Sequence, residues 1–337
     1  MQKSRAVRGF LRWLPAAAAV WLFLAAWPAL AQSEMTRWMG PELGQVPTLL
    51  HYQGEYSPEA AVAGQGGDFR YSGHRFSAVT PLWQDPDQEM SVQFLAASTQ
   101  VDTSAVLPDS GTEFPDSWWD LRLSGSYRWR DSRGWIWGGN LQVGSASDEP
   151  FQGEEEISLG ANALVRIPSG EDAAWIFFVN YNNRRDFLSG APIPGAAYWY
   201  RPSEKLVVVA GLPFLEVTYR PWRPLGFSLQ YFFPRSVRAA ADWRFLPGWQ
   251  LSGGFSWKYV AYFRAERTHA QNRLFFYQKR LFADLAWRVA PGLRLTLGVA
   301  WAFDREIFEG ESYDDNDLNR LDLANGPIYQ AGLSFRF

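Results

Sequence analysis

The sequence has no cysteine, only three histidines and a formal net charge of −3 over 337 residues. The absence of cysteine excludes disulfides and a lipid anchor carried by a cysteine at a cleavage site, and it is compatible with export. The near-neutral charge argues against a nucleic-acid partner. After Gln32 there is no run of 18 or more apolar residues, and the most apolar stretch, 206–215, contains Pro213. The sequence therefore predicts no membrane-spanning helix beyond its N-terminal region.

Aromatic residues, in contrast, are abundant. The chain contains 18 Trp, 14 Tyr and 24 Phe, or 17% of its residues, while its mean hydropathy is −0.25. Trp and Tyr concentrate where a protein meets the headgroups of a membrane. A membrane β-barrel combines such rings with ordinary hydropathy, because every second residue faces a polar lumen. The composition therefore favours a barrel over a bundle of membrane helices.

The N-terminus has the pattern of a secretory signal peptide. A basic region ending at Arg12 precedes a short apolar stretch over 13–27, and Ala29-Leu30-Ala31 offers a cleavage site before Gln32. About 15 apolar residues are too few for a membrane span, which needs about 20. We expect residues 1–31 to be the signal peptide, 32–44 a periplasmic N-terminal segment and 45–337 an outer-membrane β-barrel.

Two-residue alternation is the main signal for strands. Over 120–130 and 293–304, apolar side chains occupy one face, and polar or small side chains occupy the other. A helix would instead space its apolar residues by three and four. Rings on the apolar face near strand ends, such as Tyr127 and Trp129, are typical of the aromatic girdles of membrane barrels. The pattern predicts an all-β, antiparallel, up-and-down transmembrane barrel of about 12–16 strands.

The connections between these segments largely alternate in length. Short polar or Pro/Gly turns, such as 131–134, 246–248 and 290–292, are separated by longer loops such as 101–117 and 305–326. Short periplasmic turns and longer outer loops are expected of outer-membrane barrels. We therefore assign the short turns to the periplasmic side and the long loops to the outer side.

The last eight residues carry a recognisable motif. Gln330, Gly332, Phe335 and Phe337 occupy the polar, glycine and hydrophobic positions of a segment that is similar to the C-terminal signal of outer-membrane proteins. In such proteins the signal is read by the barrel assembly machinery. The resemblance implies a location in the bacterial outer membrane. It also implies outer-membrane lipid, the assembly machinery and periplasmic chaperones as partners.

More of the chain, about 45–337, resembles a family of outer-membrane barrels known only as a domain of unknown function. The resemblance depends on four short motifs: Tyr219-Arg220-Pro221, Ala290-Pro291-Gly292-Leu293, Asp304-Arg305-Glu306 and Asn325-Gly326-Pro327. It implies the fold and the location and says nothing about an activity.

The sequence gives no sign of catalysis. His51, His74 and His269 lack a neighbouring serine motif, and we find no nucleophile with an adjacent base. The candidates for clustered acidic and histidine pairs are too scattered to form a protease site. We therefore expect a protein that is not an enzyme and has no cofactor and no catalytic or metal residues.

Charged residues recur on the face that alternation assigns to the lumen. The lumen-lining candidates are Arg122, Arg128, Arg238, Arg244, Asp242, Asp284, Arg288 and Arg294. Asp304 is assigned to the same face. A basic lining would favour anionic solutes. Alternatively, arginines and carboxylates pair across strands and fill the interior, because unpaired charges there are costly.

An acidic segment, 309–317, lies in the expected loop 305–326. Its carboxylates could bind Ca²⁺ or bridge to lipopolysaccharide through divalent ions. The spacing does not match an EF-hand, and a solvated loop is the favoured interpretation.

Two functional hypotheses remain. The first is a porin-like passive channel for small hydrophilic solutes, with a preference for anions. The second is a structural or adhesive barrel with a filled lumen that acts through its outer loops. A barrel enzyme that acts on lipid is a distant third. About sixteen strands would leave an aqueous channel, whereas about eight would leave an interior filled with side chains.

Overall fold

The computed structural model describes residues 38–185, 188–232, 236–267 and 269–337. The expected signal peptide, residues 32–37 and the Lys258 side chain lie outside this description. The chain divides into two units, and the barrel belongs entirely to the second, Pro41–Phe337. Among the described residues, no helix is long and apolar enough to cross a membrane.

The described residues of the second unit form seventeen strands and one short 3-10 helix, η2 (Glu154–Glu156). The strands are β1 (Leu49–Ala61), β2 (Asp68–Gln84), β3 (Gln88–Thr103), β4 (Ser117–Arg130), β5 (Ile136–Ser147), β6 (Ile157–Pro168), β7 (Ala173–Asn182), β8 (Ile193–Ser203), β9 (Leu206–Leu212), β10 (Phe214–Trp222), β11 (Leu225–Phe232), β12 (Ser236–Leu246), β13 (Trp249–Tyr262), β14 (Arg273–Ala290), β15 (Leu293–Gly310), β16 (Leu318–Leu323) and β17 (Gly326–Arg336).

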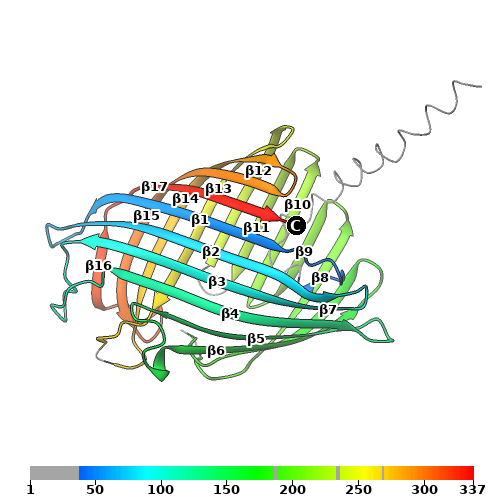
Figure 1. The fold of residues 1–337 in the computed structure, drawn as a ribbon, viewed down its shortest axis with the longest axis horizontal. Coiled ribbons are helices and arrows are strands. Elements are labelled where there is room, and N and C mark those ends of the chain that lie inside the picture. The colour runs from blue at the N-terminus through cyan, green and yellow to red at the C-terminus, as the bar shows by residue number, and fades with distance from the viewer. Residues whose placement is uncertain (1–37, 186–187, 233–235, 268) are drawn as a thin grey trace, which may run out of the picture. The chain divides into compact units, whose positions relative to one another are not determined.

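Sixteen of these strands close into an antiparallel barrel (Figure 1). Each strand from β1 to β15 pairs with its neighbour in the chain, β15 pairs with β17, and β17 pairs with β1 from Leu49↔Arg336 to Tyr56↔Tyr329. The seventeenth strand, β16, pairs with the outer end of β15, and its last residue, Leu323, also forms an isolated bridge with Val62 just after β1. The all-β barrel predicted from alternation is confirmed, at the upper end of the expected strand number.

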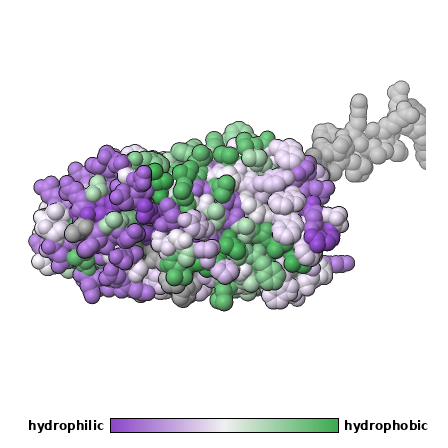
Figure 2. All heavy atoms as spheres, turned by 90° about the horizontal axis from the view of Figure 1, so that it is seen from below, coloured by the Kyte–Doolittle hydropathy of each residue, from purple (hydrophilic) through white to green (hydrophobic). Residues whose placement is uncertain are grey.

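Alternation works here because the two faces of each strand meet different surroundings. Leu121 and Leu123 on β4 share the outward face, whereas Asp120 and Arg122 share the inward face. Outward side chains stay exposed even when they are large and apolar, with Leu297 at 66%. Figure 2 shows these side chains as a broad hydrophobic zone on the barrel wall beside a hydrophilic end. Exposed apolar surface of this extent marks contact with another apolar phase.

Aromatic rings stack on the outward face near the short turns. Trp83 stacks on Tyr127 at 6.3 Å, Tyr127 on Trp129 at 5.4 Å, and Trp129 on Trp137 at 6.3 Å between ring centroids. These rings come from β2, β4 and β5 and form one continuous row across three strands. Such a row is expected where a barrel wall meets lipid headgroups.

Every connection at the barrel end where the chain terminates, here called the inner end, is short. The longer loops lie at the other, outer end, where β9 and β10 are nevertheless joined by Pro213 alone (Figure 1). Gly134, Gly170, Gly248 and Gly292 adopt positive φ angles in four of the inner turns. Glycine accepts this conformation without the steric cost of a Cβ atom. The alternation of short and long connections therefore reflects the two ends of the barrel.

The prediction that residues 305–326 form a loop is wrong in part. Strand β15 continues to Gly310, and β16 follows within the same segment. A bulge causes the difference: Asp304 has a φ of 46°, and the pairing of β14 with β15 shifts there. Asp304 was also wrongly assigned to the lumen, because its carboxylate lies 2.7 Å from Nζ of Lys279, which shares the outward face of β14.

The wall of the barrel is high on one side and low on the other. Strands β2, β14 and β15 have 17, 18 and 18 residues, whereas β9, β10 and β11 have 7, 9 and 8. At the outer end, Ser147 and Phe263 form a bridge between β5 and the chain just after β13. The Phe263 N–H donates to the Ala146 carbonyl at 2.8 Å. This bridge therefore links β5 to the end of β13 across the lumen.

Candidate functional site

The lumen has two halves that differ in hydration. Along the inward face of β15, Arg294, Thr296 and Gly298 are half-buried, whereas Ala300 and Ala302 are completely buried. Inward residues of β17 follow the same order, from half-buried Ser334 to buried Ile328. Solvent therefore reaches the inner half of the lumen, and packed side chains fill the outer half.

An aromatic plug, made of Phe114, Trp118, Tyr262 and Phe276, lies at the centre of the outer half. Phe114 belongs to the loop 104–116 between β3 and β4, which also buries Leu107. The ring of Trp118 is 0% exposed and lies 5.9 Å from Phe114 and 5.4 Å from Tyr262 between centroids. One loop thus completes a packed apolar core inside the barrel.

A polar latch, made of Glu309, Arg264, Asn272 and Asn319, ties this plug loop to two other outer segments. Glu309 is 1% exposed and accepts hydrogen bonds from Asn319 Nδ2 at 2.7 Å and Arg264 Nη2 at 3.2 Å. The Oδ1 atom of Asn319 accepts the N–H groups of two plug-loop residues at 3.0 and 3.1 Å. The latch therefore holds residues 109–110 in place.

The latch changes the interpretation of the acidic segment 309–317. Glu309 is the penultimate residue of β15 and is buried against an arginine, so a solvated loop is wrong for this residue. Glu311 and Asp314 are exposed. Within the described ranges, no group of three or more His, Asp or Glu residues is positioned to hold a metal ion.

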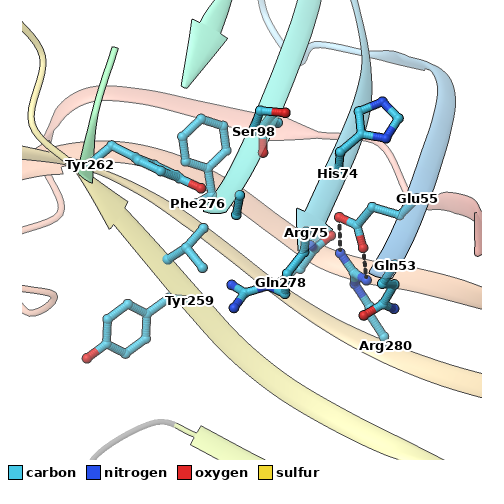
Figure 3. Close-up of a pocket in the computed structure, with 14 residues that line it drawn as sticks. Gln53, Glu55, His74, Arg75, Ser98, Tyr259, Tyr262, Phe276, Gln278 and Arg280 are labelled. Carbon is cyan, nitrogen blue, oxygen red and sulfur yellow. Dashed lines mark hydrogen bonds and ion pairs between the residues drawn. The ribbon is translucent and has the colours of Figure 1, made fainter. Parts of the chain in front are cut away.

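A small cavity of about 90 Å³ lies beside the plug, between β1, β2, β3, β13 and β14. Figure 3 shows Arg280 reaching Glu55 in this region, with nitrogen–oxygen distances of 2.9 and 3.3 Å. Arg280 also donates to the Tyr71 hydroxyl at 3.1 Å. This network satisfies a buried guanidinium from β14 with groups from β1 and β2, and it is a structural feature of the packed half.

A larger cavity of about 280 Å³ adjoins it, and Arg75 lines both. Strands β2, β4, β5, β6, β7, β13 and β14 all contribute to its wall, so it lies inside the lumen below the β5–β13 bridge. Its charged lining residues are Arg75, Asp120, Arg122, Glu156, Arg184, Arg185 and Arg273. Arg75 is inward-facing and exposed, which indicates solvent in this part of the lumen.

Both carboxylates of the larger cavity face an arginine. Asp120 accepts two hydrogen bonds from Arg122, at 2.6 and 2.7 Å. Glu156 lies 3.4 Å from Nη1 of Arg267. The lining itself holds five arginines and two carboxylates, so it carries three more positive than negative charges. A low-dielectric wall strengthens the field of such a cluster.

Six of the eight lumen-lining candidates lie on one inward wall. Arg238, Asp242 and Arg244 are on β12, Asp284 and Arg288 on β14, and Arg294 on β15. Asp242 accepts a hydrogen bond from Ser252 Oγ at 3.3 Å, and the Arg238 guanidinium lies 4.2 Å from the centroid of the Phe282 ring. These contacts place Asp242 and Arg238 on the interior face. That they line a path for solutes stays a prediction.

Arg122 and Arg128, the other two candidates, lie on β4. Arg122 lines the larger cavity, as described above. Arg128 is buried and pairs with Glu89 at 2.6 Å, and it also donates to the Glu42 carbonyl at 2.8 Å. It therefore binds the segment before β1 to the inner end of the wall.

That segment, Pro41–Val46, contacts the inner end at several points. Arg130 donates to the Pro41 carbonyl at 2.8 Å, and the Gly44 N–H donates to Glu89 at 2.8 Å. A Cβ atom on Gly44 would lie 2.3 Å from the Asp85 carbonyl oxygen, so only glycine allows this approach. The described end of the predicted N-terminal segment therefore packs on the inner turns, while its boundary at residue 44 stays a prediction.

The four residues of the predicted C-terminal signal lie on or next to β17, which is hydrogen-bonded to both β1 and β15. Gln330 and Gly332 share the inward face, and the Phe335 and Phe337 rings meet edge to face at 4.3 Å. The position fits a closing strand. Recognition by an assembly machinery stays a prediction.

The three histidines do not come together. His51 Nδ1 lies 2.8 Å from Ser334 Oγ, and His74 Nδ1 lies 2.8 Å from the Tyr52 hydroxyl on the outward face. His269 lies in the loop between β13 and β14, where its carbonyl accepts the Asn272 N–H at 3.0 Å. The described contacts give none of them a nucleophile and an acid partner.

Sequence reasoning missed most of the larger cavity. Arg75 lies at an inward position of β2, and strict alternation over 69–80 could have found it. Arg184 and Arg185 lie in a loop, and Arg273 begins β14, so no alternation marks them. The strand pairings alone bring them to one place.

Comparisons with known proteins show similarity in architecture alone. No protein-family model and no curated protein matches the sequence. Several solved structures align with most of this chain at low identity and low TM-score. The OccK7 (OpdD) protein of Pseudomonas aeruginosa is 11% identical with a TM-score of 0.42, over 87% of this chain and 99% of that chain. The Pseudomonas putida toluene transporter TodX is 8% identical with a TM-score of 0.40, over 86% and 89%. An outer-membrane channel from Pseudomonas putida F1 is 12% identical with a TM-score of 0.39, over 86% and 94%. The resemblance to an uncharacterised barrel family stays a prediction, and this chain is an all-β, closed, sixteen-strand antiparallel barrel.

Proposed function

We propose that the protein is a passive channel of the bacterial outer membrane for small hydrophilic solutes, and that the packed outer half of its lumen corresponds to a closed state. One observation carries the proposal: below a packed outer half that loop 104–116 completes, the lumen holds solvent-exposed charged side chains and a charged cavity. A barrel with a purely structural interior has no need for a solvent-exposed arginine such as Arg75 in mid-lumen.

The membrane part of the proposal is supported by the outward surface. Leu141, Leu285 and Leu297 are exposed apolar side chains on three different strands. The hydrophobic zone in Figure 2 and the row of stacked rings on β2, β4 and β5 suit a barrel surrounded by lipid. The signal peptide and the C-terminal motif predicted from sequence agree with this location.

The closing element is suited to movement. The plug loop 104–116 is not part of the hydrogen-bonded wall, so its displacement would leave the barrel intact. It is held by the packing of Leu107 and Phe114 and by the hydrogen bonds of Asn319. Loops that fold into the lumen set the permeability of wide barrels.

Conductance in a planar lipid bilayer tests the proposal. We expect the unmodified protein to show brief, infrequent openings. The substitution Leu107→Ala removes a completely buried side chain from the plug loop and should raise the open probability, while Val106→Ala, 41% exposed in the same loop, should not. Ion selectivity is obtained from the reversal potential in a salt gradient.

A second candidate function is a structural or adhesive barrel that acts through its outer loops. The packed outer half of the lumen and the hydrophilic outer end favour it. The same recordings decide between the two. Absence of conductance from both the unmodified protein and Leu107→Ala, with folding verified by heat-modifiable gel mobility, would overturn the channel proposal and favour the alternative.

A further inference from the structure

We infer that a row of inward-facing amides, formed by Asn140, Asn162 and Asn180 and here called the amide row, is a binding site for a small, neutral, polyhydroxylated solute such as a mono- or disaccharide. The inference rests on the proposed function, because it names the class of hydrophilic solute that the channel would admit. The three residues lie on the neighbouring strands β5, β6 and β7.

The strand pairing places the three amides side by side on the inward face. Asn162 is directly opposite Asn140 in the pairing of β5 with β6, and directly opposite Asn180 in the pairing of β6 with β7. Ser126 of β4 lies opposite Asn140 and shares the inward face with Arg122. Neighbouring strands are about 4.8 Å apart, so the row is about 10 Å long. All three amides are half-buried, so solvent reaches them.

Hydrogen bonds join the amide row into one chain. Asn162 donates from Nδ2 to Asn140 Oδ1 at 3.4 Å, and Asn180 donates to Asn162. At the two ends, Arg185 donates to Asn180 Oδ1, and Asn140 donates to the Gly125 carbonyl at 3.2 Å. An amide has two N–H donors and an oxygen with two lone pairs. Each amide of the row therefore uses one donor and one lone pair in this chain and retains one of each for a ligand.

The retained groups match the chemistry of hydroxyl groups. A hydroxyl both donates and accepts, and an amide offers both functions, whereas a carboxylate only accepts and an ammonium group only donates. The segments 138–144, 158–164 and 178–182, which contain the row, have no charged residue. An ionic solute would therefore gain no counter-charge from these stretches of the wall. A row about 10 Å long suits one or two sugar rings.

The larger cavity continues this polar surface towards the outer end. Gln142 and Asn182 lie two residues beyond the row on β5 and β7, and both line this cavity of about 280 Å³. Gly160 lies between them in the register and has no side chain, so it leaves room between the two amides. Gln142 is half-buried, and its amide has no hydrogen-bond partner within the described part of the chain. Such an amide is available to a ligand in the cavity.

The size and the strength of the site suit a small solute in passage. A cavity of about 280 Å³ is at the low end of small-molecule sites. Hydrogen bonds between neutral groups are weaker than those that involve a charge. A channel needs binding that is favourable enough for entry and weak enough for release. Neutral amides on the wall meet both requirements for a neutral solute.

Saturation-transfer NMR with maltose tests the site. The full-length protein is refolded in a detergent without a sugar headgroup, its signals are irradiated, and the transfer to maltose is measured as the maltose concentration rises. We expect transfer that saturates. Triethylene glycol dimethyl ether, which has ether oxygens and no hydroxyl group, is the reference probe and should give no saturable transfer.

Two substitutions test the amides themselves. Asn162→Ala removes the centre of the row and should weaken maltose binding by about tenfold or more, because the hydrogen bonds of one ligand hydroxyl are lost. Gln142→Met keeps the length of the side chain and should weaken binding by about threefold or more. Gln250→Met is the matched control, because Gln250 is also a half-buried amide, on the same face of β13 as Ser252, and lies outside the site. It should bind maltose as the unmodified protein does.

The Gln142 amide makes no hydrogen bond in the described structure, so Gln142→Met is expected to fold even if Asn162→Ala disturbs the row, and heat-modifiable gel mobility checks this. Weaker maltose binding in either folded variant, with the control unchanged, supports the inference. It would be overturned by an absence of saturable transfer to maltose, or by equal binding in both variants and the unmodified protein. Equal transfer to the ether would also overturn it, because uptake by the micelle would then explain the signal.

The two proposals fail separately. A protein that binds maltose through Asn162 and Gln142 but never conducts would remove the channel and retain the site. A protein that conducts but does not bind maltose would retain the channel and remove the site.

Discussion

The substitution Glu309→Gln should release the plug loop. Both carboxylate oxygens of Glu309 accept hydrogen bonds, Oε2 from Arg264 and Asn319 and Oε1 from Asn272 at 3.5 Å. A glutamine side chain has one acceptor oxygen and one NH2 group that can only donate. Its amide nitrogen would therefore face another donor in either orientation. Arg264, whose side chain is 3% exposed, would also lose its buried counter-charge.

Breaking one partner of a buried ion pair costs about 3–5 kcal/mol. The outer loops can relax, so we expect the lower part of this range, a shift of about a hundredfold towards the open loop. Hydrogen exchange measured by mass spectrometry should show faster exchange over 104–116 in Glu309→Gln than in the unmodified protein. The exposed neighbour Glu311, changed to Gln, is the control and should leave exchange over 104–116 unaltered.

A double substitution checks the reasoning further. Replacing Arg264 by Met and Glu309 by Leu removes both charges, and apolar pairs of similar volume often restore stability. We therefore expect slower exchange in the double variant than in Glu309→Gln. Equal exchange over 104–116 in the unmodified protein and Glu309→Gln would refute the view that the latch holds the plug.

Three further outcomes are expected. Gly254→Ala should lower the folded fraction in heat-modifiable gel mobility, because its Cβ would lie 2.0 Å from the Ala239 carbonyl oxygen, whereas Gly253→Ala, with 3.6 Å to its nearest atom, should not. Carboxyl NMR in micelles should give Asp131 a pKa of about 2. Burial alone would raise this pKa, but hydrogen bonds from Arg133, Trp137 and the backbone stabilise the carboxylate by more and lower the pKa overall. The stabilisation by Asp131 is then complete above its unfolded pKa of about 4 and lost as the pH falls through about 2, and an ordinary pKa would contradict it. Deleting Phe337 should reduce assembly of the barrel in cell envelopes, and normal assembly would argue against the C-terminal signal.

The strands were predictable because alternation is a local property. Each residue from Asp120 to Arg130 faces either outward or into the lumen, and the side chains change between apolar and polar at every second position accordingly. Alternation fails where the backbone is irregular. The bulge at Asp304 exchanges the outward and inward positions of the residues that follow it. The sequence pattern therefore predicted a loop from residue 305, where β15 in fact continues to Gly310.

The contents of the lumen were not predictable in this way. Strand number alone suggested an open channel, but loop 104–116 enters the barrel and buries Leu107 and Phe114. The β5–β13 bridge joins Ser147 to Phe263, and these residues are 116 positions apart in the sequence. No local sequence pattern indicates such a contact. The cavity beside the bridge and its arginines can therefore be found only from the strand pairing in the structure.

In the proposed membrane location, the low wall of the barrel has a consequence for the surrounding lipid. At about 3.3 Å per residue, β9 is about 23 Å long, whereas β14 is about 60 Å long. A tilted strand as short as β9 cannot match a hydrocarbon layer of about 30 Å. Lipid beside β9 and β10 must thin, or the barrel must lean towards that side. Either response makes the bilayer around the barrel asymmetric. Neighbouring proteins would then meet a different local bilayer thickness or barrel tilt beside β9 than beside β14.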